Sequence, residues 1–290
     1  MIWFFVFVAV CAATWFFLVA YQYLKRFNFD PSKCGWLGCE LELFVVDLAS
    51  GKVVARAAEI INAVSAPWCK PELGATQVEI TTDTLPTAEA IVSQLMSRLR
   101  TVRQVARELG LGLVAMEYAP YDIPIDAFPS PRYERIANQM SEYRRRAAMR
   151  LAALHFHHGC GSWSDAFRVH NAFVRKISCS MIRGDHSRGA RHATFQTFHA
   201  TIMPMRIWNR FFFVVRAIVR GYLKDPKLDW SWERISVHGT VEGRSYGSID
   251  DPDEILDLLR WRVKVSGLPI PSAVQQHDIP SREYARAALS

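Results

Sequence analysis

The sequence lacks the cysteine patterns of zinc-binding domains and of small disulfide-stabilised domains. Its six cysteines include no CxxC pair, and their spacings match no zinc module. A chain of 290 residues that is 50% hydrophobic is long enough to form a large core without disulfide bonds. We therefore expect reduced thiols, with Cys39 and Cys160 acting as small buried hydrophobes and not as nucleophiles.

Clusters of basic residues are also scarce, although the formal net charge is +7. The tight run is Arg144-Arg145-Arg146, and the other basic residues are scattered through segments with helical periodicity. This distribution argues against a nucleic-acid-binding surface. A basic balance still favours anionic small molecules or an acidic membrane surface over cationic partners.

Charged side chains are absent from residues 1–24. As a helix this run is roughly 36 Å long, enough to cross a hydrocarbon core of about 30 Å. Lys25 and Arg26 follow at once, so the positive-inside tendency puts the rest of the chain in the cytoplasm. We predict a single-pass membrane anchor over 1–24, a juxtamembrane linker over 25–35 and a catalytic domain over 36–290. The alternatives are a signal segment, or a misassigned start codon in front of a cytoplasmic protein.

Strands and helices interleave along the rest of the chain, with no internal repeat and no low-complexity tract. Strands are predicted over 39–47, 52–55, 75–81, 111–116, 151–158 and 235–246. Helices are predicted over 57–64, 86–109, 132–150, 164–181 and 205–223, and from 251 onward. The polar stretch Arg183–His192 is predicted to be an exposed loop. This pattern is typical of the α+β or α/β class.

Four of the strand segments carry polar side chains two residues apart in an otherwise apolar context. The pairs are Glu40 and Glu42, Gln77 and Glu79, His155 and His157, and Glu242 and Arg244. Because side chains alternate along a strand, both members of each pair project from the same side. Glu72, seven residues before Glu79, adds a further carboxylate. We expect these groups to converge on one face of a sheet.

Such a face would be unstable without compensation, because close carboxylates repel one another and lose solvation when buried. A divalent cation relieves this repulsion. Carboxylates with one or two imidazoles suit Mg²⁺ or Mn²⁺, particularly when phosphate oxygens complete the coordination shell. Arg244 adds a planar guanidinium that fits phosphate oxygens.

These segments, in this order, resemble the type 2 glutamate–cysteine ligase (carboxylate–amine ligase) family and, more distantly, the glutamine synthetase superfamily. The matching segments are GCELELFVVD at 38–47, PELGATQVEITTD at 71–83, PSPRYERIA at 129–137, LHFHHG at 154–159 and GTVEGR at 239–244. The resemblance spans about residues 36–265. The motifs are short, but together and in order they are fairly specific.

The resemblance implies an α+β fold in which a curved, mainly antiparallel sheet forms a catalytic funnel with helices on its outer side. ATP would enter one end of the funnel and the acidic amino acid the other, with Mg²⁺ or Mn²⁺ ions between them. Glu40 and Glu42 would each bind a different metal ion. Glu72 and Glu79 would belong to the ion on the amino-acid side.

On the nucleotide side, the resemblance implies that His155 and Glu242 complete the second metal site. Arg244 would steady the transferring phosphoryl group, with Glu242 beside it in the catalytic centre. Further implied contacts are Arg132 and Gln77 for the substrate, and His157, Arg188 and Arg191 for the nucleotide.

The implied reaction is ATP-dependent amide formation. ATP phosphorylates a carboxylate to an acyl phosphate, and an amine then displaces the phosphate. By resemblance, the carboxylate is the γ-carboxylate of glutamate and the amine is cysteine. A metal-dependent hydrolase and a non-catalytic, membrane-tethered relative that binds nucleotide or metal are the alternatives. The sequence makes no prediction of the oligomeric state.

Overall fold

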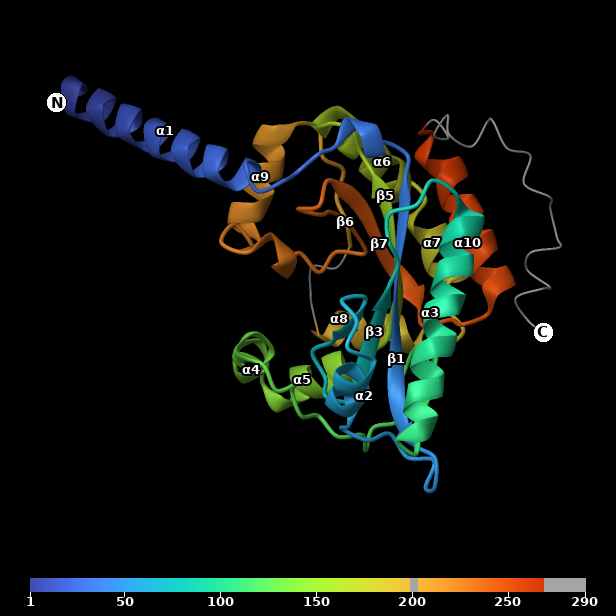
Figure 1. Cartoon of the computed structure of the whole chain (residues 1–290). Coiled ribbons are helices and arrows are strands. Elements are labelled where there is room, and N and C mark those ends of the chain that lie inside the picture. The colour runs from blue at the N-terminus through green and yellow to red at the C-terminus, as the bar shows by residue number, and fades with distance from the viewer. Residues whose placement is uncertain (199–202, 269–290) are drawn as a thin grey trace.

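An antiparallel sheet forms the centre of the computed structural model, which describes residues 1–198 and 203–268 (Figure 1). The strand order is β2-β3-β1-β5-β7-β6, and β4 pairs with the second half of β1. The strands are β1 (Leu37–Asp47), β2 (Cys69–Pro71), β3 (Gln77–Thr81), β4 (Leu111–Val114), β5 (Ala153–Gly159), β6 (Glu233–Ile235) and β7 (Thr240–Gly247). The sheet is open, with β2 and β6 at its edges. Mixed helix and antiparallel sheet is the class that the sequence predicted; residues 269–290 of the predicted domain lie outside the described residues.

One face of the sheet packs against helices α2 (Ala57–Val64), α3 (Ala88–Glu108) and α10 (Pro252–Ser266) (Figure 1). Alternate strand residues such as Leu41, Leu43 and Val78 are fully buried there. Each such aliphatic side chain contributes roughly 1.5–3 kcal/mol by leaving water. This apolar layer makes the sheet a rigid support for the residues that project from its other face.

Helices α6 (Trp163–Val174) and α7 (Ile177–Arg183) lie on the same face as α10, because Phe173 of α6 packs against Trp261 of α10 and the end of α7 packs against Tyr246 of β7. The remaining helices are α4 (Pro131–Asn138), α5 (Glu142–Met149), α8 (Ala190–Phe198) and α9 (Arg210–Val219) (Figure 1). Ile136 of α4, Ala148 of α5 and Phe195 of α8 line a cavity over the polar sheet face. These three helices therefore form one wall of that cavity.

Helix α3 shows how directly the sequence specifies the supporting layer. The Thr87 hydroxyl accepts the Ala90 N–H at its start, and Gly110 follows its end with φ 72°. Ile91, Leu95 and Leu99 recur on one side and are buried. The predicted helix over 86–109 is thus confirmed to within two residues at each end.

Three long predicted elements are each divided in the structure. The predicted helix over 132–150 breaks because Ser141 caps a second helix by accepting the Arg144 N–H. The helix predicted over 164–181 begins one residue earlier, at Trp163, after a Ser162 cap. It is interrupted near Lys176, where α6 ends and α7 begins. The strand predicted over 235–246 becomes the hairpin β6–β7, turned at Gly239 with φ 72°.

Two other expectations were wrong. Residues 52–55 form no strand: Val53 makes an isolated bridge to Val46 beyond the Ser50-Gly51 turn. The stretch Arg183–His192 is not a fully exposed loop, because α8 begins at Ala190 and buries Arg191 and His192. The helix predicted over 205–223 is present but shorter, as α9.

Helix α1 (Ile2–Leu24) projects from the body of the protein (Figure 1). Over Trp3–Leu24 its mean hydropathy is 2.3, so it is long and apolar enough to cross a membrane by length and composition alone. Its final turn is part of the fold, because Tyr23 and Phe27 are buried against Phe213 of α9. Residues 25–35 are likewise packed: the Arg26 guanidinium donates to two backbone carbonyls, and the Asn28 N–H donates to the Val237 carbonyl at 2.9 Å.

Candidate functional site

Strand register brings the polar pairs of the sequence into contact. Glu42 lies opposite Glu79 across the β1–β3 pairing, and Glu40 lies opposite His155 across the β1–β5 pairing. His157 lies opposite Glu242 across β5 and β7. Directly opposite residues on one sheet face are neighbours. The four strands therefore assemble a single polar surface.

This surface is one side of a cavity of about 320 Å³. Residues singled out from the sequence that line it are Glu40, Glu42, Glu72, Gln77, Glu79, Arg132, His155, His157, Arg191, Glu242 and Arg244. Arg188 does not line the cavity, so its expected nucleotide contact is not supported. It is exposed, with φ 56°, in a turn whose neighbouring Ser187 and Gly189 N–H groups bind Asp185.

Three carboxylates form the first candidate metal group. Glu42, Glu72 and Glu79 each offer one oxygen, and these oxygens lie within 4.8 Å of one another. Burial and the nearby Glu72 carboxylate raise the pKa of Glu42, while burial and Glu40 raise that of Glu79. Lys70 is the nearest compensating cation, 3.9 Å from Glu79. A divalent cation with oxygen ligands fits this donor set.

Glu40, His157 and Glu242 form the second candidate metal group, again within 4.8 Å. The Thr240 hydroxyl is 2.9 Å from His157 Nδ1, which orients Nε2 to within 3.5 Å of Glu40. That Nε2 is buried without a hydrogen-bond partner. Burial opposes protonation of His157, but the Glu40 carboxylate outweighs it and raises the pKa. An imidazole with two carboxylates suits Mg²⁺ or Mn²⁺.

His155 lies between the two groups and not within the second, where the resemblance assigned it. Its Nδ1 is 3.5 Å from Glu40, and its Nε2 is 3.7 Å from Glu42. Burial and the Arg244 charge lower its pKa to about 4, so the ring is neutral at physiological pH. The neutral His155 ring therefore lies between the Glu40 and Glu42 carboxylates and contributes no charge to either candidate metal group.

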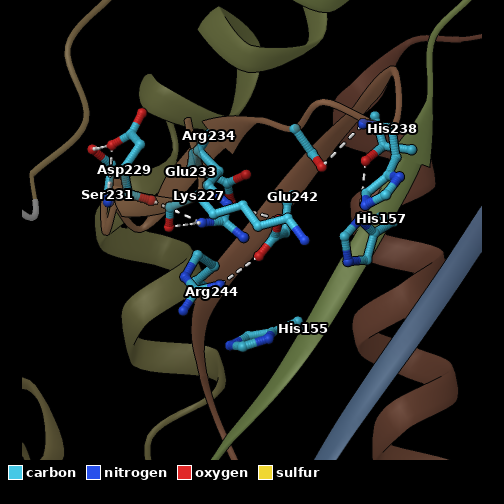
Figure 2. A network of polar contacts seen from close by, with 12 residues as sticks. His155, His157, Lys227, Asp229, Ser231, Glu233, Arg234, His238, Glu242 and Arg244 are labelled. Atoms are coloured by element: carbon cyan, nitrogen blue, oxygen red, sulfur yellow. Dashed lines mark hydrogen bonds and ion pairs between the residues drawn. The ribbon is translucent and has the colours of Figure 1, made fainter. Parts of the chain in front are cut away.

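Glu242 is held by two arginines. Figure 2 shows it between Arg234 of β6 and Arg244 of β7, beside His155 and His157 of β5. Its carboxylate is 2.7 Å from Arg234 Nε and 2.5 Å from Arg244 Nη1. Burial would raise the pKa of Glu242, but the two guanidinium groups outweigh it and lower that pKa. The carboxylate is thus ionised and fixed in position.

Arg234 was missed by the sequence reasoning, because the segment before Gly239 was interpreted as part of one long strand. In the hairpin, Arg234 registers opposite Glu242. Its guanidinium also donates to the carbonyls of Lys227 and Asp229, so it ties the preceding loop to the site (Figure 2). The signal that could have revealed it is Gly239, placed where a hairpin turn needs a positive φ.

Arg191 lines the cavity and also has a structural role; its predicted nucleotide contact stays a prediction. Its guanidinium is buried and donates to the backbone carbonyls of Ala152, Arg244 and Ser245. These bonds lie where β7 has one extra residue relative to β5, a bulge next to His155. Arg191 therefore fixes the backbone that carries Arg244, although it also lines the cavity.

The glycine of the Glu-Gly-Arg motif has a packing reason. A β-carbon at Gly243 would collide with the guanidinium of Arg262 on the opposite face of the sheet. Arg262 is fully buried and pairs with Glu233 at 2.7 Å. The motif therefore places Glu242 and Arg244 on the cavity side while leaving room for a buried ion pair behind them.

A second cavity of about 410 Å³ adjoins the first. The two share Glu40, Lys70, His157 and His238 in their linings. The second cavity extends toward the beginning of β1, where Trp36 and Thr82 line it. The second metal group therefore lies at the junction of two cavities, and the first group lies on one side of that junction.

Fold and site together define a protein of mixed helix and antiparallel sheet with an acidic, arginine-bordered cavity on one sheet face. Among known families, the model of glutamate–cysteine ligase family 2 matches residues 36–178. The resemblance carried by the sequence motifs is thus confirmed as a similarity to glutamate–cysteine ligase family 2 over residues 36–178.

Individual relatives agree with the family match. A protein provisionally named glutamate–cysteine ligase 2-2 from Legionella pneumophila strain Paris is 22% identical over 228 residues, covering 72% of this chain and 59% of the relative. A similarly named glutamate–cysteine ligase 2 from Thermobifida fusca strain YX is 27% identical over 253 residues, covering 79% and 62%. This chain therefore spans less than two thirds of the length of either relative.

Among solved structures, a bifunctional glutathione synthetase from Pasteurella multocida aligns with a TM-score of 0.55. The alignment covers 89% of this chain and 43% of that protein, at 10% sequence identity. At this identity the likeness concerns the fold alone.

Proposed function

We propose that this chain is an ATP-dependent carboxylate–amine ligase that uses Mg²⁺ or Mn²⁺. The observation that carries the proposal is the pair of acidic groups in one cavity, with Arg244 beside them. By analogy with the named relatives, the default substrates are glutamate, through its γ-carboxylate, and cysteine. The polar face of the sheet, with its two adjoining cavities, would then be the catalytic funnel.

Two cation sites follow from the donor sets. Glu42, Glu72 and Glu79 would hold one divalent ion, and Glu40, His157 and Glu242 the other. Bound there, the ions would offset the negative charge of the phosphate oxygens. The raised pKa values of Glu42 and Glu79 support this assignment, because carboxylates that repel one another in a buried site are those that a cation stabilises.

The arginines of the cavity would bind the transferring phosphoryl group. Arg244 uses Nη1 to hold Glu242, while its Nε is buried without a hydrogen-bond partner. A phosphoryl oxygen would satisfy this donor. Arg244 is therefore the group best placed to stabilise charge during transfer, and Glu242 fixes its orientation.

The substrates would approach from the two sides of the shared junction. The nucleotide would occupy the second cavity, next to Glu40 and His157. The acidic amino acid would bind on the side of Glu42, Glu72 and Glu79, where Gln77 and the exposed Arg132 line the wall. The two reactive groups would then meet beside Arg244.

The reaction proceeds in two displacements. A carboxylate oxygen attacks the γ-phosphorus, the bond to ADP breaks and an acyl phosphate forms. The amine then attacks the acyl carbon, the acyl C–O bond to phosphate breaks, and the proton lost by the amine passes to solvent. No enzyme nucleophile is required. Cys39 and Cys160 are buried, and burial raises the pKa of the Cys160 thiol to about 12, which keeps it protonated.

Helix α1 would anchor the ligase in a membrane by a single pass. Lys25 and Arg26 at its end favour a cytoplasmic position for the domain. The apolar stretch over Trp3–Leu24, which is largely exposed before Ala20, supports this assignment by length and composition.

The direct test is phosphate release from ATP by the full chain, purified in detergent, with Mg²⁺ and a panel of acids and amines. We expect release that needs one acid together with one amine. Glu242→Gln should lower the rate by at least about 100-fold, because Arg244 loses its orienting partner and a charged ligand is removed. The matched control is Glu89→Gln, an exposed carboxylate on α3 paired with Arg260, which should behave like the wild type.

Three outcomes would contradict the proposal. Hydrolysis of a substrate with metal but without ATP would indicate a metal-dependent hydrolase. Binding of ATP and Mg²⁺ without phosphate release, under every pairing of acid and amine, would indicate a non-catalytic relative. Equal rates for wild type and Glu242→Gln would remove the cavity from the reaction.

A further inference from the structure

Helix α9 is apolar on both sides, and the described structure covers only one of them. Phe213, Val214 and Ala217 are buried against α1 and α6. On the other side lies what we call the α9 outer face: Trp208, Phe211, Phe212, Ile218 and Val219, which are 64%, 56%, 51%, 38% and 79% exposed. A helix that is hydrophobic all round is typical of a buried or lipid-contacting position. Exposure of such a contiguous apolar face to water is unfavourable and typically marks a contact with protein or lipid.

The position of α9 relative to α1 indicates the partner. α9 lies at the base of α1, and the ring centroids of Phe16 and Phe211 are 5.5 Å apart (Figure 1). Tyr21 lies near the end of the apolar run, where aromatic side chains typically mark the membrane surface. Phe16 precedes Tyr21 by five residues and therefore lies roughly 7.5 Å deeper along the α1 axis. The apolar face of an interfacial helix enters a bilayer by about 5–10 Å. A membrane crossed by α1 would therefore reach Phe211.

Charge is complementary to the same partner. Segment 203–224, which contains α9, has five basic residues and no acidic residue. Arg206 and Arg210 are exposed next to the α9 outer face, and Lys25 and Arg26 follow α1 directly. Each basic residue near an anionic membrane surface contributes about 1 kcal/mol of attraction. Aromatic and aliphatic side chains flanked by cations fit a lipid interface better than a neutral protein surface.

We infer that α9 lies in the headgroup region of the leaflet from which α1 emerges, with the α9 outer face toward the acyl chains of a bilayer that contains anionic lipids. This inference rests on the proposed crossing of the membrane by α1. It gives the domain two contacts with the membrane, one spanning and one interfacial, and so a fixed orientation. The segment after α9 supplies Lys227 and Trp230 to the cavity lining, so that wall of the cavity would lie close to the lipid surface.

The test uses the full chain reconstituted into phosphatidylcholine vesicles with and without phosphatidylserine. The exposed Cys11 and Cys179 are replaced by serine, and an environment-sensitive fluorophore is attached through Phe212→Cys. The matched control carries the fluorophore through Ser50→Cys, at the exposed turn after β1, far from α1 in the fold (Figure 1). Phe212 is exposed, so its replacement leaves the core intact.

We expect the label at position 212 to emit at shorter wavelength and to be quenched by brominated acyl chains at least about threefold more than the label at position 50, more so with phosphatidylserine. Equal quenching at the two positions, in protein that resists alkaline carbonate extraction, would overturn the inference while leaving the anchor in place. Shielding from water without quenching, together with cross-links between copies, would assign the face to a second copy and also overturn it. Extraction of the protein by carbonate would overturn the anchor itself. None of these outcomes tests the proposed ligase activity, which the phosphate-release assay measures separately.

Discussion

Glu79 is the residue at which the demands of folding and of cation binding conflict most clearly. It is buried on β3, facing Glu40, Glu42 and Glu72. Burial and these three neighbours raise its pKa, since each disfavours another negative charge. In the absence of a cation, the fold therefore carries a cost that only protonation or displacement of a side chain can reduce.

Glu79→Gln should separate these two demands, because glutamine keeps the shape and removes the charge. Without metal, we expect the variant to be more stable than the wild type by about 1 kcal/mol, since the repulsion is relieved. With Mn²⁺, we expect the melting temperature of the wild type to rise and that of the variant to stay unchanged.

Thermal denaturation with and without Mn²⁺ measures both effects. Glu59→Gln, which removes an exposed carboxylate paired with Arg56, is the matched control and should respond to Mn²⁺ as the wild type does. An equal Mn²⁺ response in Glu79→Gln and wild type would show that the cation binds elsewhere.

Individual site residues could be predicted as far as strand alternation reaches. Side chains two residues apart on a strand share one face, so alternation predicted that Glu40 and Glu42 project together and that Glu242 and Arg244 do so as well. The choice between His155 and His157 depended on the β7 bulge and on the Thr240 hydroxyl, both of which are set by strand register. Register is decided by contacts between segments far apart in the chain, which a single sequence does not display.

Elements with strong local signals were predicted well, and those whose limits depend on tertiary contacts were not. Helix α2 matches its predicted range, and α10 begins at Pro252, within one residue of the predicted start at 251. The hairpin β6–β7 was hidden because its turn, at Ser236–Gly239, contains no strong breaker before Gly239. The burial of Arg191 could not be predicted because its acceptors are backbone carbonyls of β7 and of the residue before β5.

One contact between elements should make stability depend on pH. His186, in the α7–α8 connection, lies 2.9 Å from Glu117 and 2.9 Å from Glu254 of α10. Burial lowers the pKa of His186, but the hydrogen bond to Glu117 and the charge of Glu254 outweigh it, so the pKa is raised. The folded state thus holds the proton more tightly than the unfolded chain. This contribution is fully present below the unfolded value of about 6.5 and is lost as pH rises through the raised pKa.

His186→Gln should therefore destabilise the protein more at about pH 6 than at about pH 9. Because the side chain is 55% exposed, solvent screening limits the difference to about 0.5 kcal/mol. Urea denaturation of both proteins at the two pH values measures it. A difference in the free energy of unfolding that does not change with pH would show that the pairing contributes no linked proton.

At the scale of the whole molecule, α1 and the domain are one structure. Tyr23 and Phe27 pack with Trp163 and Phe213 in the same core cluster. A truncation at residue 30 would remove these two aromatic side chains, at a cost of about 3–5 kcal/mol each. A domain of ordinary stability, about 5–15 kcal/mol, would lose most of its margin.

We expect a chain that begins at residue 31 to lack a cooperative thermal transition, and a chain that begins at residue 16 to retain one. Both truncations remove most of the exposed apolar stretch, so aggregation through α1 is reduced in each. Circular dichroism during heating distinguishes them. Matching transitions in the two truncations would show that the α1 end contributes little to the core.

The attachment of α1 to the cavity wall has a mechanical consequence. Arg26 is bonded to the carbonyls of Leu223 and Lys224, and Asn28 is bonded to that of Val237. These hydrogen bonds lie at the two ends of segment 223–237, which contributes Lys227 and other residues to the cavity lining. If α1 crosses a bilayer as proposed, a force that tilts or pulls α1, such as thinning of that bilayer, would be transmitted to both ends of one cavity wall. The width of the cavity, and with it the rate of any reaction inside, would then vary with the thickness and tension of the membrane.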